Sequence, residues 1–462
     1  MKKIKKTISF FLVFILLTLI AFQTCGEQLL SSEEAIEDAR YLRDRLETIH
    51  PNLYFATKKE AVENRFDDIL DRLRAEENWS KKALYRELAP FVAGFKDGHT
   101  FLSVHEEFEK YAAAGGKLFP LLVRIHDGRI SVTANLRGTK PGAGTLITAI
   151  NGVAAGEVVR KMENLVGAAR KPFIERKISR NFPIYLWVLF EFDGLYSIDY
   201  KTKDGREEKL NTAGITIDRY RERKDQVLGK RELNWELSFP RKDVALLTLN
   251  TFRGNLKKEF QKFVKNSFRR IKSQDAKYLI IDLRNNGGGS TELSDYLYRY
   301  VSGKPFRTFA EVRVRYSKPV RKEQNILNPI TLFRVKVLGE ELITYRNDYH
   351  VPPKPKYRFD GELFVLTGPG TFSTAADFAA TIKDVDAGKI VGAETGGLAS
   401  SYGDVFSGEL PNSGLDFGVS YKHFIRTGGF DDGRGVIPDI RGDFGEAEAF
   451  RKFFFIDPDM AD

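Results

Sequence analysis

Residues 364–378 read FVLTGPGTFSTAADF and predict a strand, a tight turn and a helix that begins at a serine. The apolar run 364–367 is typical of a buried strand, and Gly368 and Gly370 permit a sharp turn after it. Ser373 then opens a helical pattern, where the helix dipole and free backbone N–H groups stabilise negative charge on an attacked carbonyl. Taken alone, the segment favours a helix N-cap, the commoner role of serine at such a place, and a nucleophile is the alternative.

Strands alternate with helices on both sides of this segment. The apolar runs 244–252, 278–283, 362–367 and 389–393 predict strands, and the patterns 256–272 and 291–302 predict helices between them. Continuous apolar strands with helical crossovers indicate an α/β fold with a buried, largely parallel sheet. The basic insertion 303–360 is compatible with a lid, an interface or a hairpin.

Two further motifs carry residue types suited to catalysis. The run 278–290, YLIIDLRNNGGGS, ends a buried strand in three glycines, which let the backbone approach a ligand closely. No lysine follows them, so a phosphate-binding loop is not supported, and a flexible turn is the plain alternative. In FKDGHTFL, 95–102, His99 follows a helix end and leads into a strand, and it is the most constrained of the six histidines. Taken alone, a histidine at such a place is more often structural than catalytic.

A fourth motif, DDGRGVIPDI at 431–440, places two carboxylates before a glycine-bounded turn. Asp431 or Asp432 could orient an imidazole, as the acid of a catalytic triad does. A solvated acidic turn explains the same residues equally well.

The first 25 residues predict an export signal. Four lysines precede an apolar stretch, 10–22, which is too short for a comfortable membrane span. Cys25, the single cysteine, follows it in the position of a lipid-modified cysteine, although residues 22–24 differ from the usual small residues. We therefore expect an exported bacterial protein, periplasmic or held at the cell envelope through a lipidated Cys25.

Charge and periodicity divide the rest of the chain. The net charge is +10, but acids are interspersed among the bases, so no nucleic-acid partner is indicated.

Helices are predicted over 31–50, 59–76 and 80–95, within an N-terminal helical region 26–115 that carries His99. Short strands follow over 121–125, 130–134 and 146–150, within a unit 116–212. The charged segment 213–242 is interpreted as a linker before a core of 243–462.

Together these motifs resemble the S41 family of serine peptidases, which includes the carboxy-terminal processing proteases, the tricorn core and retinoid-binding-protein repeats. The resemblance rests on DGHT (97–100), LIIDLRNNGGG (279–289), TGPGTFSTAADF (367–378) and GRGVIPDI (433–440), in this order. It implies a crotonase-like (ClpP/crotonase) peptidase core. The run 140–152, KPGAGTLITAING, resembles a PDZ-like peptide-binding domain.

The resemblance also implies roles for individual residues. Ser373 is the nucleophile, and Gly288 and the Thr374 amide form the oxyanion hole. The processing branch uses a lysine base, but Leu398 stands at that position, and Lys383 and Lys389 are expected to face elsewhere. The tricorn-like branch uses Ser-His-acid, which implies His99 as base with Asp432, or else Asp431, as the acid.

The expected activity is hydrolysis of polypeptide substrates through an acyl-enzyme, without a metal or other cofactor. The alternative from another class is a non-catalytic S41-fold protein that binds peptides or small apolar ligands, since retinoid-binding members of the family carry such ligands.

Overall fold

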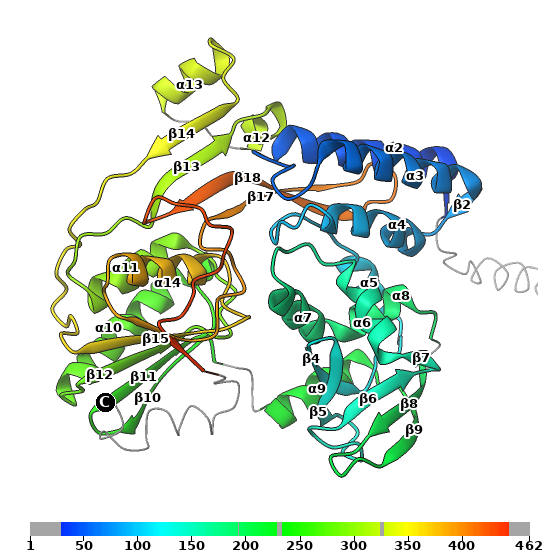
Figure 1. The fold of residues 1–462 in the computed structure, drawn as a ribbon, viewed down its shortest axis with the longest axis horizontal. Coiled ribbons are helices and arrows are strands. Elements are labelled where there is room, and N and C mark those ends of the chain that lie inside the picture. The colour runs from blue at the N-terminus through cyan, green and yellow to red at the C-terminus, as the bar shows by residue number, and fades with distance from the viewer. Residues whose placement is uncertain (1–28, 193, 229–232, 324–327, 443–462) are drawn as a thin grey trace, which may run out of the picture.

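The computed structural model describes residues 29–442, apart from 193, 229–232 and 324–327. The predicted signal segment, Cys25 and the last twenty residues of the expected core lie outside this part. Three regions follow one another along the chain: N-terminal helices, a middle region (residues 118–215) and a C-terminal region (residues 235–441) (Figure 1). Within the described residues, no helix is both long enough and apolar enough to cross a membrane.

The N-terminal helices form where the apolar stripes predicted them. They are α2 (Ser32–Ile49), α3 (Lys59–Ala75), α4 (Lys81–Ala93) and the shorter α5 (His105–Ala113). Ser31 and Glu34 make the predicted capping box at the start of α2. Strands β1 (Leu30–Ser31) and β2 (Asn78–Trp79) pair antiparallel, and β3 (Phe101–Leu102) follows α4.

The middle region is an antiparallel sheet with three helices. Its strand order is β4-β5-β6-β8-β9, and β7 pairs with β6. The strands are β4 (Leu121–His126), β5 (Arg129–Asn135), β6 (Leu146–Ile150), β7 (Val153–Ala154), β8 (Leu195–Lys201) and β9 (Glu207–Ala213). The helices are α6 (Ala155–Glu163), α7 (Lys171–Arg180) and α8 (Phe182–Leu189). A bridge between Leu118 and Ile215 joins the two ends of the region.

The segment predicted as a linker holds two regular elements, α9 (Ile217–Leu228) and β10 (Trp235–Arg241). Strand β10 pairs antiparallel with β11, so the main sheet begins before residue 243. The charged sequence pattern gave no sign of this strand. An edge strand has a neighbouring strand on one edge alone and is less buried, so it tolerates charged side chains.

The C-terminal region contains the predicted, largely parallel sheet. Its order is β10-β11-β12-β15-β16-β19, with parallel pairing from β11 onward. The strands are β11 (Val244–Leu249), β12 (Tyr278–Asp282), β15 (Glu362–Thr367), β16 (Lys389–Gly392) and β19 (Ile440–Arg441). The helical elements are η1 (Gly254–Leu256), α10 (Lys257–Ser273), α11 (Thr291–Val301) and α14 (Thr374–Asp384). Side chains of α10, α11 and α14 share one buried cluster with one face of the sheet, which confirms the expected α/β class.

A second sheet joins the C-terminal region to the N-terminal helices. Its order is β14-β13-β18-β17, and β3 pairs with β18. The strands are β13 (Phe309–Arg315), β14 (Leu342–Arg346), β17 (Ser401–Glu409) and β18 (Asp416–Arg426). The basic insertion supplies β13 and β14 as an antiparallel pair, with α12 (Lys318–Glu323) and α13 (Pro329–Lys336) between them. Figure 1 shows β17 and β18 reaching from the C-terminal region to α2 and α4.

Candidate active site

Ser373 lies at the turn between β15 and α14 in a strained conformation. Its φ is +54° and its ψ is −134°, a region that favours glycine. Its side chain makes no hydrogen bond to the helix it precedes, so it does not act as the N-cap that the sequence alone favoured. The turn is held from outside, because Phe372 N donates to Asn286 O at 3.0 Å and Thr371 Oγ1 donates to Leu283 O at 2.8 Å.

The glycine-rich loop after β12 approaches this serine closely. Gly288 has a φ of +95°, and a Cβ atom built on it would lie 2.7 Å from Ser373 Cβ and 3.0 Å from Thr374 N. Any larger residue would therefore collide with the turn. The Thr374 amide is the first of α14 and has no partner within the helix, while Gly288 N donates to Asn286 Oδ1 at 2.9 Å. The two predicted oxyanion residues thus lie beside the serine.

His99 lies next to the same turn although it comes from the N-terminal region. Its imidazole covers the ring of Phe372, the residue before Ser373, with ring centroids 4.6 Å apart. The Tyr402 backbone in β17 also lies close enough to the imidazole to favour its protonated form. Among the described residues, His99 and Ser373 make no direct hydrogen bond. Such contacts are often long in a ligand-free enzyme and shorten when substrate binds.

Asp97 fixes the turn that carries His99. Its carboxylate accepts from His99 N at 3.0 Å, from Thr100 Oγ1 at 2.6 Å and from Ser420 Oγ at 2.6 Å. His50 Nε2 lies 3.5 Å from the same carboxylate. Burial alone would raise the pKa of Asp97, but the nearby imidazole of His50, the charge of His99 and the Ser420 hydroxyl hold it well below its usual range. Asp97 is therefore a buried anion.

The pKa of His99 is lowered from its ordinary value of 6.5. Burial is the main cause, since it disfavours the imidazolium, and the charge of Lys177 acts in the same direction. The charges of Asp97 and Asp404 oppose this shift. A neutral imidazole at neutral pH can accept a proton, as a general base must.

The two acids of the 431–432 turn do not contact His99. Asp431 Oδ2 lies 3.3 Å from His423 Nε2, and the His423 ring stacks on that of Tyr402 at 4.3 Å. Asp432 Oδ1 accepts from Arg434 N at 3.0 Å, within its own turn. Within the described residues, the contacts of Asp431 lead toward His99 through His423 and Tyr402.

The lysines considered as alternative bases are occupied elsewhere. Lys383 pairs with Asp439, and Lys389 lies 3.9 Å from Asp386. Leu398 forms a backbone bridge with Gly435. These positions agree with the expectation that no lysine of this segment serves Ser373.

Sequence reasoning missed two residues that shape the site. Asp97 belongs to the DGHT motif, but its buried hydrogen bonds depend on Ser420, more than three hundred residues later. Phe173 of α7 stacks on Phe372 with ring centroids 4.3 Å apart and an interplanar angle of 12°. No local pattern distinguishes this phenylalanine from one in the core of the middle region.

Comparison with known proteins identifies the domain that holds the serine. Residues 243–441 match the model of Peptidase family S41. The chain carries an S41 peptidase domain. This S41 domain contains β11 to β19, the glycine-rich loop and Ser373, while His99 comes from outside it.

Solved structures extend the likeness to most of the chain. The structure of mature CPAF matches with a TM-score of 0.63 at 16% identity, covering 89% of this chain and 92% of that one. A CPAF mutant matches with a TM-score of 0.64 at 17% identity, covering 89% and 93%. At these identities the likeness concerns the fold alone. No curated protein matches the sequence.

Proposed function

We propose that this protein is an exported serine peptidase that hydrolyses peptide bonds through an acyl-enzyme formed on Ser373. One observation carries the proposal: a strained serine opens α14 beside Gly288, with the His99 imidazole on the neighbouring ring. Its place within an S41 peptidase domain supports the same reaction.

In the proposed reaction, Ser373 Oγ attacks the substrate carbonyl carbon and His99 takes the hydroxyl proton. The backbone N–H groups of Thr374 and Gly288 stabilise the oxyanion, which requires Gly288 N to leave Asn286 Oδ1 or to share its hydrogen. The C–N bond then breaks as His99 returns the proton to the leaving amine. Water hydrolyses the acyl-enzyme by the same proton transfers, and no metal or cofactor is required.

We propose that the acid which assists His99 comes from the 431–432 turn, and that Asp431 acts indirectly, by positioning Tyr402 through His423. The support is the Asp431–His423 pair, the stacking of His423 on Tyr402 and the effect of the Tyr402 backbone on the pKa of His99. Asp431→Asn should therefore lower kcat more than Asp432→Asn does, and the reverse order would transfer the role to Asp432.

The remaining parts of the proposal concern domains and location. We propose a crotonase-like core for the S41 domain and a PDZ-like middle region that binds an extended peptide by strand addition.

The proposal of export rests on the basic and apolar N-terminal segment, with Cys25 as the lipidation site that would attach the protein to a membrane. Labelling cells with a radioactive fatty acid, with Cys25→Ala as the control, tests the attachment.

The decisive experiment is labelling by a fluorophosphonate, which reacts with activated serines. Ser373 should be modified, and Ser373→Ala should lose both labelling and peptidase activity without unfolding. Ser273→Ala, an exposed change at the end of α10, is the matched control and should keep both. A folded wild-type protein that is neither labelled nor active would instead be a non-catalytic binding protein.

A further inference from the structure

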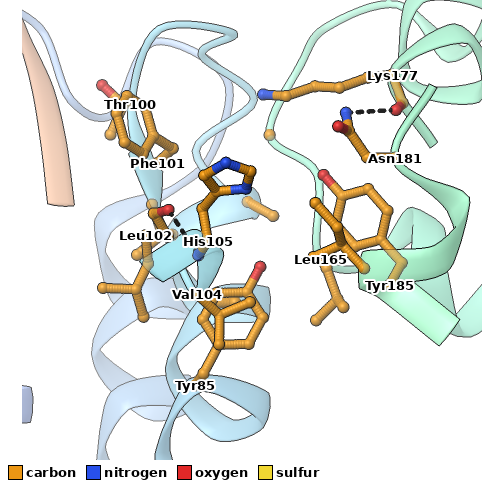
Figure 2. A pocket seen from close by; sticks show the side chains of 16 residues that line it. Tyr85, Thr100, Phe101, Leu102, Val104, His105, Leu165, Lys177, Asn181 and Tyr185 are labelled. Carbon is orange, nitrogen blue, oxygen red and sulfur yellow. Dashed lines mark hydrogen bonds between the residues drawn. The ribbon is translucent and has the colours of Figure 1, made fainter. Parts of the chain in front are cut away.

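A cavity of about 170 Å³ lies between the N-terminal helices and the middle region, next to the proposed base. Its first wall comes from α4 and residues 100–105, which begin directly after His99. Its second wall comes from α7 and α8, including Lys177, Asn181 and Tyr185. Figure 2 shows the Lys177 side chain extending from the second wall toward the first, across the cavity. A peptide whose scissile bond lies near His99 would therefore pass close to this cavity.

The amino group of Lys177 lies on the second wall of this cavity. Within the described part of the chain, no carboxylate lies within ion-pair distance of its ammonium, although the Asp97 charge acts on it from farther away. Asp97 is already engaged by His50, Thr100 and Ser420. Burial lowers the pKa of Lys177, the direction expected for an ammonium that has lost water and gained no close counter-ion. Burying an ammonium group without a close counter-ion costs folding free energy, and a bound anion offsets that cost.

Other polar groups line the same cavity. The hydroxyl groups of Tyr85 and Tyr185 belong to residues that are 3% and 8% exposed, and neither hydroxyl has a hydrogen-bond partner among the described residues. Asn181 Nδ2 donates to the Lys177 carbonyl at 2.9 Å, which ties the amide to the same turn of α7 (Figure 2). Ammonium and hydroxyl donors set among apolar side chains suit a ligand that has one charged end and an apolar stem.

We infer that this cavity is a specificity pocket that receives a carboxylate of the peptide substrate, with Lys177 as its counter-ion. The inference rests on the proposed peptidase function and names a class of substrate for it. The carboxylate comes from an aspartate or glutamate side chain near the scissile bond, or from the C-terminus of the peptide.

The test compares cleavage of a defined peptide library by the wild type, Lys177→Gln and Lys177→Glu. Lys177→Gln should lower kcat/KM about 10- to 100-fold for peptides with the carboxylate, the range expected for a hydrogen bond to a charged group. Matched peptides with glutamine should change little, and Lys177→Glu should favour lysine in the same position. If the pocket binds the terminal carboxylate, amidating the C-terminus of the peptide abolishes the preference for the carboxylate. If the pocket binds a side chain, amidation has no effect.

Lys171→Gln is the matched control, since Lys171 is on the same helix, is exposed, and does not line the cavity. An equal loss of activity on all peptides in Lys177→Gln would overturn the inference, because Lys177 would then act in the chemistry or in the fold. Unchanged preferences would also overturn it.

A binding measurement separates this inference from the proposed reaction. Fluorescence anisotropy with the inactive Ser373→Ala variant should give tighter binding of a glutamate peptide than of its glutamine match, and Lys177→Gln should remove the difference. If the wild type cleaves nothing and is not labelled at Ser373, the proposed function fails. If the wild type is active but Ser373→Ala binds the glutamate peptide and its glutamine match equally well, only the inference about the pocket fails.

Discussion

At the scale of single residues, Ser373, the proposed nucleophile, lies in a strained backbone conformation. A non-glycine residue with a φ of +54° and a ψ of −134° costs about 1–3 kcal/mol. The hydrogen bonds of Phe372 and Thr371 to the neighbouring loop hold the turn in this state. Ser373→Gly should therefore be more stable than Ser373→Ala, although both lack the hydroxyl. Urea unfolding of the two variants measures the difference, and equal midpoints would mean that the strain is absent.

The proposed role of His99 as general base predicts the pH dependence of the proposed reaction. Its pKa is lowered from 6.5, so the imidazole stays neutral, and active, somewhat below that pH. Activity should fall only when further acidification protonates the ring. The pH profile of kcat/KM should show this acidic limb with a midpoint below 6.5. A midpoint above that value would require a nearby anion that stabilises the imidazolium.

Asp377, one turn after Ser373, predicts a pH-dependent stability. Burial raises its pKa well above the usual range, and the charges of Asp295 and Asp404 add to this. A carboxyl group with a raised folded-state pKa contributes stability at low pH and loses it as pH rises through that pKa. Asp377→Asn should therefore come closest to the wild type below about pH 4, where an aspartate is protonated in both the folded and the unfolded state, and should exceed its free energy of unfolding increasingly from there to about pH 8. A gain that did not grow with pH would contradict the shift.

At the scale of elements, the turn after α4 depends on a carboxylate that the sequence does not mark as structural. Asp97 accepts hydrogen bonds from within its own turn and from Ser420 in β18. Asp97→Asn should cost about 3 kcal/mol of stability, because it disrupts a buried charged network. It should also lower kcat, since the backbone of His99 loses its anchor. Asp432→Asn, in an exposed turn, is the control for removing one carboxylate, and denaturation and kinetics would be measured on both.

The elements themselves follow largely from local sequence. Apolar periodicity predicted the strands and helices of the S41 domain because buried parallel strands are apolar along their whole length. It missed β10, since an edge strand needs fewer apolar residues. It also gave no sign that β3 pairs with β18, because a two-residue strand carries no period. Ser373, His99 and Gly288 could be named from their motifs, whereas Asp97, Phe173 and Lys177 act through partners distant in sequence.

At the scale of the whole molecule, α7 brings the middle region onto the loops that surround Ser373. Phe173 stacks on Phe372, Arg176 donates to Asn285, and Arg170 pairs with Glu394. Phe372 thus lies between Phe173 and His99.

Phe173→Ala should loosen this stack and lower kcat/KM about 10-fold, since small displacements of catalytic groups are costly. The free energy of unfolding should fall less than for a core phenylalanine, because Phe173 is only half-buried. Phe173→Leu keeps an apolar contact and should retain most activity. Steady-state kinetics on both variants checks this, and full activity in Phe173→Ala would show that the stack does not position His99.

The pairing of β3 with β18 joins Phe101 to Gly418 and Leu102 to Phe417. The ribosome must therefore synthesise the chain through β18 before this pairing can help to place His99 beside Ser373. A translation product that ends between α14 and β18 would carry both the histidine and the serine but would lack the strand on which β3 is paired.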